Sequence, residues 1–318
     1  MPTQIIAGRV NIDGTTAGGT GFYVRALGDG IFIVEFDSAL PKVPSVVIKQ
    51  NYKNWDGFDY GGGDTRDNAV LVAVDKKGFK VLTGQSDGSH VDRNFAFIAA
   101  VDSTQDDLAI VWGDIYTTAE TYSPYPAPGF EATGIGDGVF LVDFDQPFDA
   151  LSSVVVTQNY LNWNEFTFTS GKTTDNAVIV AAKNSQFKYI TGDSAGNKVD
   201  RNCSFVAVGT RNAAGTRPRF AFGNVDANGV IRDSGSADFG IEKGPTGTYT
   251  IRFHQPFTNP PALLVTQNYK SWDDFKFSTG DTRDNAVLVA VDTVQALVIT
   301  GQNDGSKVDR NFSFLAVG

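Results

Sequence analysis

The sequence is poor in the residues on which redox, nucleophilic and metal-dependent chemistry most often depend. Its 318 residues include one cysteine, one methionine and two histidines. Cys203 stands alone, so it cannot form an internal disulfide, and we expect it to pack as a small apolar residue. Neither His90 nor His254 forms a recognisable nucleophile–base pattern with it, and the sequence has no phosphate-binding glycine loop with a following lysine. We therefore predict that the protein is not an enzyme and has no cofactor.

Positive charge is also scarce. Lys and Arg total 26 against 36 Asp and Glu, which gives a formal net charge of −10 at pH 7. Such a surface repels phosphate backbones and anionic lipid heads, which argues against nucleic acid and membranes as partners. No apolar run has the length of a membrane span, and residues 1–6 lack the basic and apolar segments of a signal peptide. We expect synthesis in the cytoplasm without a signal peptide, which is compatible with release or with a part in an extracellular or viral assembly.

The sequence contains three copies of one set of polar motifs. Gln-Asn-Tyr-x-x-Trp occurs at 50–55, 158–163 and 267–272, and Val-Asp-Arg-Asn occurs at 91–94, 199–202 and 308–311. A position in the first copy has its counterpart 108 residues later in the second, and 109 residues later again in the third. An offset kept over such a length marks a repeat of domain size. We therefore divide the chain into a first repeat (1–102), a second repeat (103–211) and a third repeat (212–318).

Composition and spacing favour β-strands. The chain has 34 glycines and 24 phenylalanines, and no long runs of Leu, Ala, Glu and Lys. In the first repeat, short apolar segments between Gly, Asp and Pro turns predict strands at residues 5–10, 21–27, 31–36, 45–50, 69–74, 78–83 and 95–100. We therefore predict an all-β protein of three tandem antiparallel β-sandwich repeats, each with about six to seven strands. Because the connections between repeats are short, we expect them to pack as a pseudo-threefold intrachain trimer.

The repeated motifs are expected to meet at one end of each sandwich. Connections between antiparallel strands alternate between the two ends, so the loops 50–68 and 84–94 lie at the same end as the turn at 28–30. The loops that differ most among the repeats fall at the opposite end. Loops carried on a rigid sandwich are the usual place for function, so we predict the site where the repeated polar motifs meet.

Aromatic, amide and arginine side chains in these loops form a candidate ligand-binding site in each repeat. Flat aromatic rings stack on sugar rings, amides offer paired donors and acceptors, and arginine offers a planar fork of donors. The candidate ligand-binding residues are Asn51, Tyr52, Trp55, Arg93, Asn159, Tyr160, Trp163, Arg201, Asn268, Tyr269, Trp272 and Arg310. The same residues also fit structural roles, the tryptophans as lids of the core and the arginines as contacts between repeats. The Asp-Asn pairs that precede Ala69, Ala177 and Ala286 fit turn caps.

A calcium site at the same end is a weaker alternative. In the first repeat its oxygen ligands would come from Asp64, Asp67, Asp87 and Asp92. The second repeat has Lys172 in place of the first of these aspartates and Ala195 in place of the third. A metal required in all three repeats would not survive these replacements, so we predict no metal site.

Residues 251–265, 286–291 and 312–318 resemble the H-type lectin domain. That family has a Phe-x-x-Pro-Phe-x-x-x-Pro-x-Val opening, a central strand followed by Gly-Phe, and a closing aromatic-x-Ala-x-Gly. The resemblance implies a six-stranded antiparallel sandwich, assembly as trimers and binding of galactose-type sugars. The family's closing tryptophan is phenylalanine here, at Phe97, Phe205 and Phe314, so no individual sugar contact is carried over. The repeats are also similar to sandwich modules of phage tail-fibre tips and bacterial adhesins.

We therefore predict a multivalent, lectin-like protein that binds neutral sugars through the aromatic and amide loops at one end of each repeat. Its expected partners are glycans or a glycosylated cell surface, with further copies of the chain as a second class of partner. A phage tail-fibre-tip or surface-adhesin module that binds a receptor is the alternative. A glycosidase is a weaker one, because carboxylates are present but nothing in the sequence gives two of them distinct environments.

Overall fold

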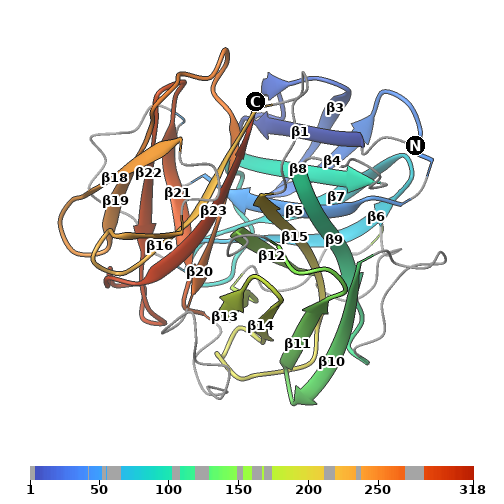
Figure 1. Cartoon of the computed structure of the whole chain (residues 1–318). Helices are drawn as coiled ribbons and strands as arrows, with labels where there is room; N and C mark the ends of the chain where they lie inside the picture. The colour runs from blue at the N-terminus through green and yellow to red at the C-terminus, as the bar shows by residue number, and fades with distance from the viewer. Residues whose placement is uncertain are drawn as a thin grey trace.

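The computed structural model describes residues 4–41, 43–51, 55, 66–101, 108–118, 129–148, 153–159, 167, 174–210, 219–233, 238–268 and 283–318. Within these ranges every regular element is a β-strand, and the strands form four hydrogen-bonded sheets (Figure 1). The prediction of an all-β protein is confirmed. The described ranges include no helix with the length and apolar character needed to cross a membrane.

The strands follow one another in a corresponding order in each repeat. The first repeat contains β1 (Gln4–Val10), β2 (Thr16–Gly19), β3 (Phe22–Gly28), β4 (Ile31–Phe36), β5 (Ser45–Gln50), β6 (Ala69–Asp75), β7 (Gly78–Thr83) and β8 (Phe95–Val101). The second contains β9 (Leu108–Ile115), β10 (Phe130–Gly136), β11 (Val139–Phe144), β12 (Ser153–Asn159), β13 (Ala177–Lys183), β14 (Gln186–Thr191) and β15 (Asn202–Thr210). The third contains β16 (Phe220–Val225), β17 (Ile231–Asp233), β18 (Phe239–Lys243), β19 (Thr248–Phe253), β20 (Ala262–Asn268), β21 (Ala286–Val291), β22 (Gln295–Thr300) and β23 (Asn311–Val317).

Most strands lie where the sequence pattern predicted them. In the first repeat β4, β5 and β7 coincide with the predicted ranges, and β1, β3, β6 and β8 differ by one residue at one or both ends. The short strands β2 and β17 were not predicted. Each lies at the edge of a sheet and pairs with a single neighbour, so its backbone geometry comes from that neighbour more than from an apolar pattern of its own.

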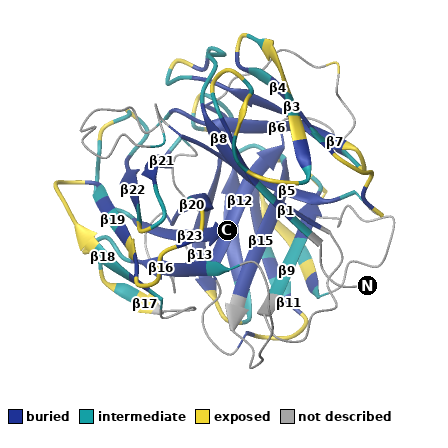
Figure 2. Cartoon of the chain, turned by 90° about the horizontal axis from the view of Figure 1, so that it is seen from above, coloured by how far each residue is buried: buried dark blue, intermediate teal, exposed yellow. Residues whose placement is uncertain are grey.

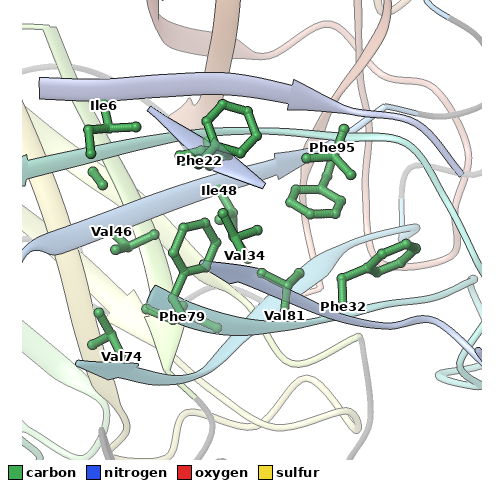
Figure 3. Packing of buried hydrophobic residues seen from close by; sticks show 14 of the residues in the cluster. Ile6, Phe22, Phe32, Val34, Val46, Ile48, Val74, Phe79, Val81 and Phe95 are labelled. Carbon is green, nitrogen blue, oxygen red and sulfur yellow. The ribbon is translucent and has the colours of Figure 1, made fainter. Parts of the chain in front are cut away.

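In the first repeat two sheets pack face to face around a core rich in phenylalanine. One sheet has the order β2-β1-β8-β5, and the other contains the run β3-β4-β7-β6. Figure 3 shows Phe32, Phe79 and Phe95 packed between strands of the two sheets. The rings of Phe79 and Phe97 meet edge to face with their centroids 4.9 Å apart. Corresponding residues form separate apolar cores in the second and third repeats, so the architecture is sandwich-like throughout.

A glycine in the middle of β9 allows an aromatic ring to approach the backbone closely. A Cβ atom built on Gly113 would lie 2.3 Å from Cζ of Phe130, far inside van der Waals contact. Gly8 and Gly223 take the same position in the other two repeats, each under a phenylalanine ring.

We expect Gly113→Ala to lower the free energy of unfolding by about 2 kcal/mol, because the ring of Phe130 must leave its packed position. Chemical denaturation of the variant and the wild type measures the difference. Gly240→Ala is the matched control: Gly240 also lies in a strand, but a Cβ there would come no closer than 3.5 Å to its nearest neighbouring atom. Equal stability of Gly113→Ala and the wild type would contradict this account of the core.

Three parallel contacts join the repeats. The end of β12 pairs with β6, and the end of β20 pairs with β13. Asn51, which follows β5, forms a parallel bridge with Leu288 of β21. We call these three contacts the joints. Through them the second repeat contacts the first, the third contacts the second, and the first contacts the third.

The inner strands of all three repeats share one buried centre. Its apolar side chains include Val47, Ile98, Ala100, Val155, Val206, Val208, Phe222, Leu264, Leu315 and Val317. Figure 2 shows the buried strands β12, β15, β20 and β23 crossing the middle of the molecule. This second packing surface explains why every residue of β5 is buried, whereas β4 alternates between buried and half-buried positions.

Candidate functional site

The repeated motifs meet at one end of each sandwich, and we call this end the rim. In the first repeat Asp92 accepts a hydrogen bond from the backbone N–H of Gly30 at 2.6 Å, so the Val-Asp-Arg-Asn motif holds the turn between β3 and β4. Asp200 and Asp309 make the same bond in the other repeats. The expectation that the loop 84–94 and the turn 28–30 lie at the same end is confirmed, while residues 52–54 and 56–65 of the loop 50–68 lie outside the described residues.

The glutamine of Gln-Asn-Tyr-x-x-Trp fixes the second motif loop. Gln50 donates from Nε2 to the carbonyl of Gly84 at 2.8 Å and accepts from the N–H of the same glycine at 3.1 Å. The glutamines of the second and third repeats make the same pair of bonds. This side-chain amide makes hydrogen bonds to both backbone groups of a buried glycine. Its role is therefore to stabilise the loop, and not to bind a ligand.

The asparagine that ends Val-Asp-Arg-Asn also has a structural partner. The side-chain oxygen of Asn94 accepts from the N–H of Ile12 at 2.6 Å. Asn202 and Asn311 accept in the same way from the backbone that follows β9 and β16. The asparagine of this motif is buried in each repeat, and the arginine that precedes it is half-buried.

Each of these arginines lies beside a buried aspartate of its own repeat. The distances from Nη2 to the carboxylate are 3.5 Å for Arg93–Asp67, 3.5 Å for Arg201–Asp175 and 3.2 Å for Arg310–Asp284. The arginine side chains are 23%, 23% and 25% exposed, whereas each aspartate is 2% exposed. Burial raises the pKa of Asp175 to about 6, although the nearby guanidinium of Arg201 opposes the shift. The rim thus presents three equivalent, partly exposed guanidinium groups.

A ring of three asparagines connects these ion pairs from one repeat to the next. Asn68 donates to the carbonyl of Asp175 at 3.0 Å, and Asn176 donates to that of Asp284 at 3.2 Å. Asn285 closes the ring with a bond of 3.2 Å to the carbonyl of Asp67. These residues fitted turn caps in the sequence, but in the structure they bind neighbouring repeats to one another.

The predicted ligand-binding asparagines lie in the joints. Asn51, Asn159 and Asn268 are 0% exposed, and Asn51 donates to the carbonyl of Val289 in the third repeat at 2.8 Å. Direct contact between a ligand and these side chains would require a joint to open. The three asparagines therefore join neighbouring repeats and are not part of the exposed surface of the rim.

Trp55 packs where the first repeat meets the third. Its Nε1 donates to Asn11 at 2.8 Å, and its carbonyl accepts from the N–H of Val291 at 2.8 Å. The guanidinium of Arg9 lies 5.0 Å from the centre of its ring. The other predicted aromatic contacts lie outside the described residues; they are Tyr52, Tyr160, Trp163, Tyr269 and Trp272.

The described part of the chain holds no group of three or more His, Cys, Asp or Glu side chains placed to bind a metal ion. Of the aspartates considered for calcium, Asp67 lies beside Arg93 and Asp92 bonds to Gly30, while Asp64 lies outside the described residues.

Chemically, the rim offers guanidinium donors in three copies. Comparisons with protein-family models, with curated proteins and with solved structures found no match to this chain.

Proposed function

We propose that this is a multivalent carbohydrate-binding protein, with one sugar-binding site at the rim of each repeat. The observation that carries the proposal is the threefold recurrence of the partly exposed Arg–Asp pair around the asparagine ring. The aspartates that pair with the arginines are the same residues whose carbonyls accept the ring bonds. One ring of hydrogen bonds therefore links the segments that carry the three donor groups.

The arrangement behind this proposal is a pseudo-threefold intrachain trimer of β-sandwiches. It is supported by the three joints, which link equivalent strands in the order second to first, third to second and first to third. The shared apolar centre, to which all three repeats contribute corresponding residues, supports it as well. Three weak sites held in one rigid body bind a repeated glycan with avidity greater than any single site.

The chemistry of the rim suits a neutral polyhydroxylated ligand. A guanidinium group donates to neighbouring sugar hydroxyls in a fixed plane, and the buried aspartate behind it keeps its orientation. The same loops carry repeated tyrosines and tryptophans, side chains of a kind that stacks on sugar faces, although the ring of Trp55 itself packs against Arg9. The resemblance to H-type lectins favours the same class of ligand.

The test is a glycan array, probed with the wild type and with the triple variant Arg93→Lys, Arg201→Lys and Arg310→Lys. Lysine keeps a positive charge beside each aspartate but loses the planar fork, so we expect the fold to persist and glycan binding to fall by about tenfold or more. Arg25→Gln is the control, because Arg25 is an exposed arginine paired with Glu35 on β4, outside the motif loops. A wild type that binds no glycan, or a triple variant that binds as well as the wild type, would overturn the proposal.

The receptor-binding alternative differs from the lectin-like function in the size of the ligand that the protein recognises. A fibre-tip or adhesin module would bind an intact surface polysaccharide or a protein receptor and would ignore free monosaccharides. Titration calorimetry with monosaccharides, followed by sedimentation with intact polysaccharide, distinguishes the two.

A further inference from the structure

The repeats also meet along three interfaces between neighbouring repeats, which we call the seams. Equivalent strands pair in the same register in each repeat, so residues of one seam can be compared with those of another. In the first–second seam β5 contacts β9 and β15, in the second–third seam β12 contacts β16 and β23, and in the third–first seam β20 contacts β1 and β8. Arg9, Asp114 and Asn224 pair with Ala96, Ser204 and Ser313, which are counterparts in the three repeats. Arg9, Asp114 and Asn224 therefore occupy one structural position, with a positive, an acidic and a neutral side chain.

In two of the three seams, the polar side chain at this position has serine hydroxyls as hydrogen-bond partners. In the first–second seam Ser204 donates to Asp114 at 2.6 Å, and the hydroxyl of Ser45 lies 3.0 Å from the same oxygen. In the second–third seam Ser313 donates to Asn224 at 2.7 Å. In the third–first seam alanine replaces both serines, at Ala96 and Ala262.

The third–first seam also contains a cavity of about 500 Å³. Its wall includes Ile5, Ala7, Arg9, Thr20, Asn259 and Ala262. At the position of Ala7, the other seams carry Trp112 and Phe222, whose strand partners are Val206 and Leu315, the counterparts of the Ile98 that pairs with Ala7. An alanine thus leaves space where the other two seams place an aromatic ring. Gly318 lies in the same wall, and Figure 1 shows the C-terminal end beside β1.

Arg9 is a buried cation in this wall that has no carboxylate partner among the described residues, although its guanidinium faces the ring of Trp55. It is 5% exposed. Its Nη2 donates to the carbonyl of Ala17 at 3.1 Å and its Nε is without a hydrogen-bond partner, and within the described ranges no carboxylate oxygen lies within 4.0 Å of the guanidinium. Burial lowers the pKa of Arg9 to about 10, which leaves the group charged at neutral pH. A buried cation is normally paired, because its charge has lost the solvation that water gave it.

We propose that this cavity binds a small-molecule ligand that carries one carboxylate, which pairs with Arg9. The cavity has the volume of ordinary small-molecule sites. Ile5, Ala7 and Ala262 offer the ligand's body an apolar wall, and Thr20 and Asn259 offer hydroxyl and amide groups. Arg9 is the one charged side chain of the lining, and a carboxylate is the planar anion that a guanidinium group pairs with through two parallel hydrogen bonds. This site goes beyond the proposed function, because it lies in one seam and not at the three rims.

The net charge of −10 acts against anion binding only at long range. Exposed charges farther away than about 10 Å are largely screened at 0.1 M salt, whereas the buried guanidinium interacts at contact distance in a medium of low polarity. We therefore expect binding to weaken only slightly when the salt concentration is raised.

The experiment is titration calorimetry with benzoate and glucuronate as carboxylate probes, and with benzyl alcohol, glucose and inorganic sulfate for comparison. We expect a carboxylate probe to bind the wild type with 1:1 stoichiometry and the neutral probes and sulfate to bind much more weakly. Arg9→Gln should weaken carboxylate binding by about 10- to 100-fold, the usual value of a charge-assisted pair. Arg25→Gln, which changes an exposed arginine already paired with Glu35, should leave binding unchanged.

Ala7→Trp provides a second test that leaves Arg9 in place. It introduces the residue found at the equivalent position, Trp112, and its ring should occupy the part of the cavity beside Ala7 and strongly weaken carboxylate binding without unfolding the protein. The proposal is overturned if no carboxylate probe binds the wild type at about 10 mM, or if Ala7→Trp binds as the wild type does. Carboxylate binding that is lost in the triple Arg→Lys rim variant and kept in Ala7→Trp would place the site at the rim, and would equally overturn the seam site.

Discussion

Replacing Asp114 with asparagine is expected to stabilise the protein by about 4 kcal/mol at pH 8, and by almost nothing below about pH 4. The Asp114 side chain is buried between the first and second repeats, where its only described side-chain partners are the hydroxyls of Ser204 and Ser45. Burial raises the pKa of this carboxyl from 3.8 to about 7, although both hydroxyls stabilise the ionised form. Above pH 7 the folded protein therefore carries a buried negative charge that no cation among the described residues pairs with.

The direction of the pH dependence follows from proton binding. Between about pH 4 and pH 7 the folded state holds a proton on Asp114 that the unfolded state has released. Stability therefore falls as the pH rises through this window, and stays lower above it. Asparagine has no proton to lose, so the difference in unfolding free energy between Asp114→Asn and the wild type should grow from pH 4 to pH 7 and then remain constant. Urea denaturation at a series of pH values measures it.

The third repeat provides the control. Asn224 occupies the position of Asp114 and accepts from Ser313 at 2.7 Å, which shows that this environment accommodates an asparagine. The reverse change, Asn224→Asp, should introduce the same fall in stability between pH 4 and pH 7. If Asp114→Asn gave a pH-independent difference, or destabilised the protein at pH 8, the carboxyl would have to be paired in a way that this account excludes.

Much of each repeat could be predicted from the sequence because local rules determine it. The apolar segments 31–36, 45–50 and 78–83 coincide with β4, β5 and β7, since alternating burial and turn residues act within a few residues of the chain. The meeting of Asp92 with Gly30 followed from counting antiparallel connections. Both results need only the order of strands within one sandwich.

The contacts between repeats could not be predicted in this way. Asn51 lies in a polar motif that is typical of a surface loop, yet it is buried because it bridges Leu288 of the third repeat. Nothing near Asn51 in the sequence identifies that partner. The recurring residues also do not identify the seams, because Arg9, Asp114 and Asn224 occupy one position of the repeat and differ from one another. A comparison of the residues that follow the equivalent glycines 8, 113 and 223 would have found them.

Lys49→Met is the second change with a large expected effect, and its pH dependence has the opposite sign. Lys49 is buried, and its ammonium nitrogen donates to the side-chain oxygen of Asn285 at 2.6 Å. Burial lowers the pKa of Lys49 from 10.5 to about 7. The second and third repeats have Thr157 and Thr266 at this position, and both hydroxyls bond to backbone groups of a neighbouring repeat.

Between pH 7 and about pH 10.5 the unfolded state binds a proton on Lys49 that the folded state lacks, so stability rises with pH through this window. A methionine of similar length removes the desolvation penalty but leaves the oxygen of Asn285 without this donor, which costs about 1–3 kcal/mol. We therefore expect Lys49→Met to be more stable than the wild type by about 3 kcal/mol at pH 6 and slightly less stable above pH 10.5.

The measurement is again urea denaturation at a series of pH values. The decisive observation is the pH at which the unfolding free energies of Lys49→Met and the wild type become equal. Thr157→Lys is the matched control, since it places a lysine at the equivalent position of the second repeat and should lower stability most at low pH. A wild type that stays more stable than Lys49→Met at pH 6 would mean that the ammonium group is well solvated or paired. The loss of stability caused by Asp114 reaches its full value above pH 7, and that caused by Lys49 has its full value below pH 7. The double variant Asp114→Asn and Lys49→Met should therefore be more stable than the wild type on both sides of neutrality. Asp114 lowers stability above about pH 4 and Lys49 lowers it below about pH 10.5, so the two penalties overlap and the double variant should gain most near pH 7.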